Sequence, residues 1–565
     1  MDRHAPRPRA SHIKVRTGCI TCKIRRVKCD EAKPECRRCV STGRKCDGYV
    51  QPSEGTPGTL LLYSLSPSPT SISVQESRGL EFFFHTTSHQ FAGLLERDFW
   101  RRSVLQLSLS EHSIRQALAA LGALHECESL QRPLDTVIAE RLYNRALRST
   151  MTKATTGETA VPIVVMSSIL FTSFEFLRGN AAAAATHIAS GINIIGSMRQ
   201  IAAAAPQQVW GRGYSSFETQ FLHSELAPIL TLFSLNASEF SPFPTSRLIL
   251  NPINAGGPTL AERFETLREA RVALVDLVTS CADLFQSLDE DVGGQELLSA
   301  SAMDASHSLQ TSFELWKAKF QDLLNRCKST WSKDERSAAN IIRIMHYGSE
   351  IGLTAYLVTS ECDWDNYREE YEQILQLIEA IVVDSSGLEA ESRSPLSLES
   401  GLIYPMHAIA WKCRYPDLRR RGLDLLLRCP RREWLLDSRQ YHAIFSRIID
   451  MEESKCPGSE FGAVLDPDLL PPERARVSDF SCVADPGPNG DPTRYAVTFM
   501  TKPDRINGDW QYTTEYMSLP TIGMAGLPPS NLISPRRWAK PDTTSPDAAM
   551  RMKAAVFGPY RTLIV

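Results

Sequence analysis

The stretch CITCKIRRVKCDEAKPECRRCVSTGRKC, Cys19 to Cys46, decides how this chain is organised. Its six cysteines follow the spacing C-x2-C-x6-C-x6-C-x2-C-x6-C, in which the half-pattern C-x2-C-x6-C is written twice. Only 14 of the 565 residues are cysteine, so chance does not account for this regularity. The six thiols therefore act as one set.

Three kinds of centre use such a set: disulfide bonds, zinc ions and an iron–sulfur cluster. The close C-x2-C pairs favour metal, because both sulfurs of a pair can turn to one ion, whereas a bridge between them would be strained. Residues 1–10 lack the apolar core of a signal peptide, so we expect a reducing compartment. Disulfides are the first alternative to be excluded.

The number of ions follows from valence. Two zinc ions need eight bonds from six thiolates, so two sulfurs must bridge; the alternative is one ion with two spare thiols. The halves mirror each other and neither completes a tetrahedral set, which favours two ions that share the leading cysteine of each half. Six thiolates and two Zn²⁺ leave a net charge of minus 2, which the basic residues between the ligands outweigh. These basic residues are Lys23, Arg25, Arg26, Lys28, Arg37, Arg38, Arg44 and Lys45. A compact centre with a positive surface indicates phosphate as the partner.

The segment from Gly18 to Tyr49 resembles the fungal binuclear zinc cluster (Zn2Cys6) transcription factors almost position for position. The resemblance implies two Zn²⁺ per chain, with Cys19 and Cys36 as bridging ligands. It assigns one site to Cys22 and Cys29 and the other to Cys39 and Cys46. Pro34 matches the loop proline of the family.

The family also implies a way of reading DNA. A short helix after the first C-x2-C pair enters the major groove and reads a CGG-type triplet. The matching positions are Arg25 and Arg26, with Lys23 and Lys28 as phosphate contacts. Many members have lysine at one of the two reading positions, where this chain has arginine. Arginine can pair bidentately with guanine O6 and N7, so this chain can still recognise guanine. The resemblance thus implies a sequence-specific transcription regulator that binds double-stranded DNA in the nucleus.

The charge of residues 1–50, called the head below, differs from that of the rest of the chain. Residues 1–50 hold 14 Lys and Arg against 5 Asp and Glu, whereas the rest holds 48 against 60. The head suits nucleic acid and the remainder does not. Apolar residues at 42% and charged residues at 22% are typical of a protein with a sizeable core. The longest uncharged apolar segment, Val161 to Phe174, is shorter than the roughly 20 residues that a membrane span requires.

We expect a mainly α-helical protein with a small antiparallel β element near the C-terminus. The predicted organisation is a basic flexible arm (1–18), a DNA-binding domain (19–46), a Ser/Pro-rich linker (47–75), a helical regulatory body (76–456), a β-rich element (457–520) and a mobile tail (521–565). The linker lacks the heptads of a coiled coil, so homodimerisation by that route is not supported. The body, from Glu76 to Glu453, resembles the helical regulatory region of filamentous-fungal members.

Helical periodicity predicts helices at 134–151, 162–176, 181–195, 313–327, 338–358, 367–382 and 402–413, and Ser113 with Gln116 suggests a capping box. Alternation predicts strands at 477–483, 495–499 and 510–516.

The aromatic residues around Phe83 and Trp100 could line an effector pocket, but an aromatic cluster at helical spacing is more typical of a core. For the arginine run from Arg419 to Arg421 we favour a solvated helix face over a second nucleic-acid patch, and for His125 a surface or capping role over metal binding.

Two functions from different classes remain. The first is a DNA-binding regulator whose body responds to co-regulators or a small-molecule effector. The second is an enzyme or chromatin-associated adaptor that the zinc cluster tethers. The chain has no P-loop, G-x-G-x-x-G, G-x-S-x-G or H-E-x-x-H motif. We therefore expect that it is not an enzyme and that no catalytic residue need be assigned.

Overall fold

The computed structural model describes residues 21–22, 27, 29–33, 35–43, 45–46, 72–130, 136–156, 160–204, 216–240, 260–291, 300–355, 360–385, 396–398, 401–428, 432–433, 436–456, 470–501 and 511–520. The chain divides into two compact units, residues 1–63 and 64–565, and each is described by itself. The predicted arm at 1–18, most of the predicted linker and the predicted tail lie outside the described residues.

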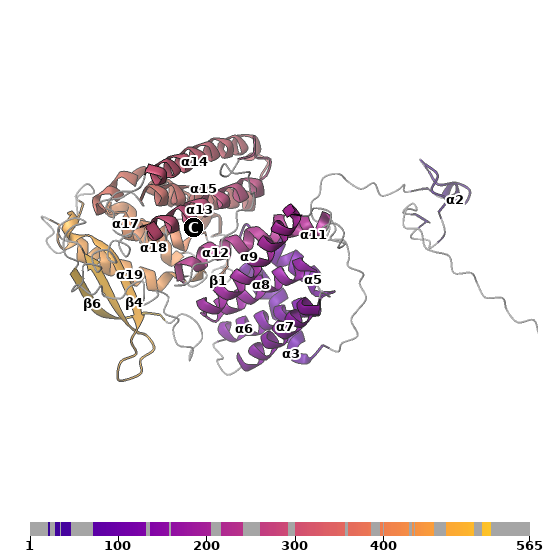
Figure 1. Cartoon of the computed structure of the whole chain (residues 1–565), viewed down its shortest axis with the longest axis horizontal. Coiled ribbons are helices and arrows are strands. Elements are labelled where there is room, and N and C mark those ends of the chain that lie inside the picture. Colours follow the sequence, from indigo (N-terminus) through magenta and orange to yellow (C-terminus); the bar gives the residue numbers. More distant parts are fainter. Residues whose placement is uncertain are drawn as a thin grey trace, which may run out of the picture. The chain divides into compact units, whose positions relative to one another are not determined.

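The core of the first unit is made of cysteine. The described side chains of Cys22, Cys36, Cys39 and Cys46 are buried together, and Val27 packs against them. The short helix α2, Arg37–Val40, begins where the Cys36 side chain accepts a hydrogen bond from the Cys39 amide (Figure 1). A unit this small has few apolar residues to bury, so a metal centre is the expected source of its stability.

The second unit begins with a helical bundle. Its elements are α3 (Val74–Phe82), η1 (Phe83–Thr87), α4 (Ser88–Phe91), η2 (Phe99–Ser103), α5 (Val104–Ser108), α6 (His112–Ser129), α7 (Thr136–Thr156), α8 (Val161–Leu177), α9 (Ala181–Ala204), α11 (Ser216–Phe221), η4 (Leu222–Leu226) and α12 (Ala227–Phe240). Helix α8 is apolar on all sides and is buried almost throughout, as expected of a helix that neighbours surround. It packs against α6 and α9 (Figure 1).

Helices α3 and α6 come into backbone contact through two glycines. A Cβ atom on Gly79 would lie 2.2 Å from the Ala119 carbonyl oxygen, and one on Gly122 would lie 1.9 Å from the Gly79 carbonyl oxygen. Any larger side chain at either position would push the two helices apart. The glycines therefore set the spacing of this pair.

The bundle continues with a second set of helices and two small sheets. The helices are α13 (Leu267–Asp291), α14 (Ala300–Cys327), α15 (Lys333–Ala355), η5 (Glu361–Tyr367), α16 (Arg368–Ser385), α17 (Ile403–Lys412), α18 (Pro416–Arg428), α19 (Ser438–Glu453) and η7 (Glu473–Ala475). The strands are β1 (Leu396–Ser397), β2 (Arg432–Glu433), β3 (Leu436–Asp437), β4 (Val477–Ala484), β5 (Arg494–Thr501) and β6 (Gln511–Ser518). The predicted mainly helical architecture is confirmed.

The predicted β element near the C-terminus is also confirmed. Strands β4, β5 and β6 form an antiparallel sheet in sequence order. The Phe480 ring of β4 lies 5.8 Å from the Phe445 ring of α19 and 5.2 Å from the Trp411 ring of α17, measured between centroids. The sheet is thus packed on the helices by aromatic contacts. The sheet β1-β2-β3 was not predicted, because strands of two residues carry no periodicity.

The predicted capping box at Ser113 is wrong. Helix α6 begins at His112, with Glu111 as its N-cap, and Ser113 and Gln116 are buried inside it. Tertiary packing overrides the local signal here. A side-chain cap does occur before α13, where the Thr266 hydroxyl accepts a hydrogen bond from the Glu269 amide at 3.1 Å.

The arginine run of α18 matches the expected solvated helix face only in part. Arg419 is fully buried and its guanidinium lies 2.9 Å from a Glu452 carboxylate oxygen of α19. Arg420 pairs with Glu453, and Arg421 pairs with Glu372 and with Glu379 of α16. All three arginines pair with carboxylates of neighbouring helices, but only Arg419 is buried, and the Arg420 side chain is 51% exposed, so the expected solvated face holds for part of the run.

Arg419 belongs to a larger buried network. Arg414 is fully buried between Glu361 of η5, at 3.0 Å, and Glu452, at 3.2 Å, and Lys412 lies 3.1 Å from Glu361. Burial acts to raise the pKa of Glu452, but Arg414 and Arg419 outweigh it and hold that pKa below its usual range. Opposite charges compensate one another inside the core, and they tie η5, α18 and α19 together.

The remaining candidate residues of the sequence belong to the core. His125 is buried, its Nδ1 lies 2.9 Å from the Thr87 hydroxyl, and burial lowers its pKa to about 4. The expected surface position of His125 is therefore wrong. Phe91 stacks on His125 and meets Trp100 edge to face, so these two aromatic residues belong to the core, whereas Phe84 is exposed. Among the described helices, none combines the length and apolar character that a membrane crossing needs.

Candidate metal centre

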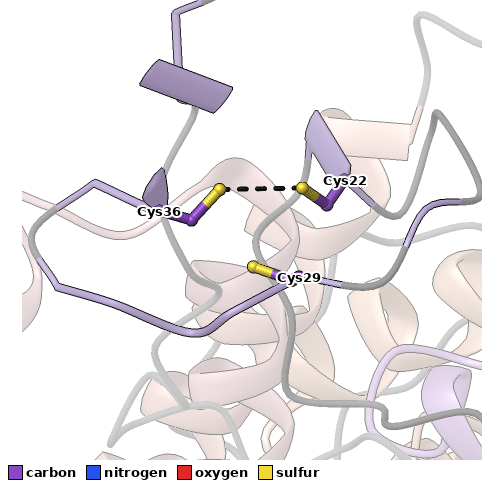
Figure 2. Close-up of side chains that lie close together, drawn as sticks. All are labelled: Cys22, Cys29 and Cys36. Atoms are coloured by element: carbon purple, nitrogen blue, oxygen red, sulfur yellow. Dashed lines mark hydrogen bonds between the residues drawn. The ribbon is translucent and has the colours of Figure 1, made fainter. Parts of the chain in front are cut away.

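Five of the six cysteines are described, and their sulfurs gather in two overlapping groups. The Sγ atoms of Cys22, Cys29 and Cys36 lie within 4.8 Å of one another, and so do those of Cys36, Cys39 and Cys46. Figure 2 shows the first group, in which the three sulfurs face a common space. Cys36 belongs to both groups.

The spacing between sulfurs fits zinc and excludes disulfides. The Cys22 sulfur lies 3.6 Å from that of Cys36 and 3.8 Å from that of Cys39. A disulfide requires about 2.05 Å, so neither of these two pairs is joined by one. Four sulfurs placed tetrahedrally at about 2.3 Å from a zinc ion lie about 3.8 Å apart. The arrangement of thiols therefore matches a zinc–thiolate centre.

Backbone amides point at the sulfurs. The Cys39 amide donates to the Cys36 sulfur at 3.2 Å, the Cys36 amide to the Cys46 sulfur at 3.5 Å, and the Glu31 amide to the Cys29 sulfur at 3.4 Å. Glu31 adopts a φ of 60°, in the left-handed region that non-glycine residues seldom occupy. Donors placed in this way stabilise the thiolate form that metal binding needs.

The residues that were expected to contact DNA are not among those described. Lys23, Arg25, Arg26 and Lys28 lie outside the described part of the chain, as do Cys19 and Pro34, so their roles stay predictions. Of the other basic residues, Arg37, Arg38 and Lys45 are described and exposed.

Two hydrogen bonds between the halves of the centre were not expected from the sequence. Asp30 accepts from the Arg37 amide at 3.1 Å, and the Thr21 hydroxyl donates to the Lys45 carbonyl at 3.3 Å. The bond to Asp30 had no local signal in the sequence, because Asp30 lies seven residues before Arg37 and Cys36 occupies the N-cap position of α2. Nothing in the spacing indicated the bond from Thr21.

Comparison with known proteins identifies the centre. Residues 17–55 match the family model described as the fungal Zn(2)-Cys(6) binuclear cluster domain. The chain carries a Zn(2)-Cys(6) cluster domain. A domain of this type binds two zinc ions through six cysteines, and the two sulfur groups around Cys36 are consistent with that number. The predicted family and cofactor are confirmed.

The similarity to curated relatives extends beyond the first unit. The aspercryptin biosynthesis cluster-specific transcription regulator atnN of Emericella nidulans is 27% identical over 67% of this chain and 65% of its own length. The transcription regulator lscL of Purpureocillium lilacinum is 29% identical over 32% of this chain and 49% of its own length. The Zn(2)-C6 fungal-type transcription factor afumD of Aspergillus fumigatus is 36% identical over 21% of this chain and 34% of its own length.

The chain thus spans less than two thirds of the length of each of these relatives. All three are named as transcription regulators or factors, and none is named as an enzyme. No solved structure matches the chain.

Proposed function

We propose that this chain is a transcription regulator that binds double-stranded DNA in a sequence-specific way through its Zn(2)-Cys(6) cluster domain. The observation that carries the proposal is the double group of cysteine sulfurs centred on Cys36, embedded in a strongly basic segment. The names of the relatives support it. Regulation of transcription implies action in the nucleus, and it gives no reason to assign catalytic residues.

The zinc ions supply cross-links that hold a segment too small to fold by apolar burial. Cys22, Cys29, Cys36, Cys39 and Cys46, with Cys19 as the sixth, are the proposed ligands, and Cys19 and Cys36 the proposed bridges. The protein supplies the thiolates, stabilises them with hydrogen bonds from backbone amides, and places basic side chains around the zinc centre. Pro34 is the proposed structural residue of the loop between the halves.

Base reading is assigned to the segment between the second and third cysteines. Arg25 and Arg26 are the proposed readers of a CGG-type triplet, because a guanidinium matches the two acceptors of guanine in the major groove. Lys23 and Lys28 are the proposed phosphate contacts. Phosphate contacts supply affinity and register, whereas base contacts supply specificity.

The remaining chain is the proposed regulatory part. Its acidic balance disfavours DNA, and its helices and small sheet form a separate compact unit. We assign 1–18 to a basic arm, 47–75 to a linker, 76–456 to the helical regulatory body, 457–520 to the β-rich element and 521–565 to a tail. Co-regulators or a small-molecule effector are the proposed partners of the body, and homodimerisation does not rely on a coiled coil in the linker.

The test uses the full chain loaded with zinc. Zinc per chain is measured, and the chain is then used to select duplexes from a randomised pool at two salt concentrations, with a chelated sample as the control. Two zinc ions per chain and enrichment of a CGG-type triplet are expected, and the chelated sample should enrich nothing. Binding that is purely salt-driven and without base preference would contradict the proposal.

A further inference from the structure

Asp30 connects the two halves of the zinc cluster domain. It directly follows the ligand Cys29 of the first half, and its carboxylate oxygen Oδ2 accepts a hydrogen bond of 3.1 Å from the Arg37 amide. Arg37 is the first residue of α2, Arg37–Val40, and its amide is one of the donors that a helix cannot satisfy internally. The bond spans seven residues and joins a loop of one half to the helix start of the other.

The contacts between the second half and the first include a shared thiol and two hydrogen bonds. The sulfur of Cys36 belongs to both thiol groups, and the Thr21 hydroxyl donates to the Lys45 carbonyl at 3.3 Å. Cys36 precedes α2 and Cys39 lies within it, so the thiol groups hold the helix, and the bond from Asp30 adds a hydrogen bond to its first amide. The bond from Asp30 is the shorter of the two.

The direction of α2 matters because of what the helix carries. Arg37 and Arg38 are its first two residues, and both side chains are exposed. They add two positive charges to the segment that the proposed function places on DNA. Phosphate contacts require each cation to lie at a set place along the duplex.

We propose that Asp30 is a positioning residue for DNA binding: it holds α2 so that Arg37 and Arg38 face the phosphates of the duplex on which the first half reads its triplet. The proposal rests on the proposed function of the domain. It assigns to an acidic residue a favourable effect on the binding of a polyanion, which is opposite to the effect of its charge.

The charge of Asp30 and its proposed positioning role have opposite effects on DNA affinity, so the sign of the change in affinity distinguishes them. If Asp30 were an ordinary surface carboxylate, Asp30→Ala would remove a negative charge near DNA and leave affinity unchanged or higher. If Asp30 positions α2, Asp30→Ala should weaken binding to the selected duplex about tenfold and lower the slope of log affinity against log salt by about 1 to 2, the share of two phosphate contacts. Asp30→Asn keeps an acceptor oxygen and should bind within about twofold of the wild type or more tightly. Glu35→Ala, which removes an exposed carboxylate from the same loop, is the matched control and should not weaken binding.

A second pair of variants probes the same bond from its donor side. Proline is tolerated at the first position of a helix and has no N–H, and Cys36, with φ −72° and ψ 135°, has the backbone that a residue before proline prefers. Arg37→Ala and Arg37→Pro both remove the guanidinium, but Arg37→Pro also removes the donor that Asp30 holds. Arg37→Pro should therefore bind less tightly than Arg37→Ala, and adding Asp30→Ala to Arg37→Pro should change little further.

All variants are measured as full chains, together with their zinc content. Two zinc ions per chain in every variant, with weak binding by Asp30→Ala and Arg37→Pro, support the proposal. Unchanged or tighter binding by Asp30→Ala overturns it, and so does equal binding by Arg37→Ala and Arg37→Pro. If Asp30→Ala loses zinc, the residue acts on the metal centre and the positioning role is rejected. A wild-type chain that selects no duplex contradicts the proposed function itself, which separates that failure from this one.

Discussion

Arg432 and Glu433 are consecutive residues of β2 whose side chains complete the ends of two different helices. The Arg432 guanidinium donates to the carbonyls of Phe176 and Leu177 at the C-terminal end of α8, at 2.8 and 3.4 Å, and lies 2.8 Å from Glu128 of α6. The Glu433 carboxylate accepts from the amides of Leu402 and Ile403 at the start of α17. Successive side chains of a strand point to opposite sides, so a two-residue strand joins early helices of the bundle to a late one.

The first prediction concerns Arg432. Arg432→Met removes a buried cation that donates to the Phe176 and Leu177 carbonyls and lies beside the Glu128 carboxylate, although the Phe176 carbonyl still accepts from the Gly179 amide. We expect a loss of about 2–3 kcal/mol in the free energy of unfolding, measured by chemical denaturation of the full chain. Arg428→Gln, at an exposed arginine that pairs within its own helix, is the control and should change stability by less than about 0.5 kcal/mol. Similar losses from both changes would contradict a special role for β2.

The second prediction concerns pH. Burial raises the pKa of Glu433 to about 7 from an ordinary value of 4.5, although three backbone amides favour its charged form. Between these two values the folded chain holds a proton that the unfolded chain has released, so stability from this group is highest below pH 4.5 and is lost as pH rises to about 7. The full change is on the order of 3 kcal/mol.

Glu433→Gln removes this titration and keeps an acceptor oxygen at the start of α17. The difference in unfolding free energy between the variant and the wild type should therefore shift in favour of the variant as pH rises from 5 to 7. A difference that stays constant over that range would show that Glu433 titrates normally in the folded chain.

The third prediction compares neighbours on one helix. Arg419 is fully buried against Glu452, whereas the Arg420 side chain is 51% exposed beside Glu453. Arg419→Met leaves a carboxylate buried with half of its compensation, and we expect a loss of about 3–5 kcal/mol in the free energy of unfolding. Arg420→Met should cost no more than about 1 kcal/mol. Denaturation midpoints of the two variants decide the matter, and equal midpoints would be inconsistent with the buried network.

The fourth prediction concerns the shared sulfur. If Cys36 bridges two zinc ions, Cys36→Ser should lower the zinc content of the chain towards zero, whereas Cys46→Ser should lower it by about one ion. Metal analysis of the purified chains gives the numbers. Equal zinc loss in the two variants would contradict the bridging assignment.

The fifth prediction separates base reading from phosphate binding. Arg26→Ala should weaken binding to the selected duplex by about 1–3 kcal/mol and relax its base preference. Lys23→Ala should weaken binding to all duplexes nearly alike and reduce the salt dependence. Binding to the selected duplex and to random DNA is compared for both variants. If both lose equally on random DNA, neither residue reads bases.

The sequence predicted the zinc centre and the helices well because each has a regular local signal. Ligands must recur at fixed spacing, and the long helices 333–355 and 368–385 carry clear apolar periodicity. The sequence did not predict which charges lie inside. Arg419, Arg420 and Arg421 look alike along the chain, but their burial depends on where α16 and α19 pack, which is a property of the whole fold. The two-residue strand β2 depends in the same way on a partner distant in sequence, because Leu396 of β1 pairs with Arg432.

The buried network of Glu361, Arg414, Arg419 and Glu452 also bears on the order in which the chain can fold as it is synthesised. Arg414 and Arg419 leave the ribosome more than thirty residues before Glu452, which compensates their charges. Arg476, which bonds to Asp365, comes later still. Until these partners emerge, packing α18 against η5 would bury cations that lack part of their compensation. The late helices are therefore expected to assemble together only after Glu452 and Arg476 have emerged, while the helices from α3 to α9 can pack earlier.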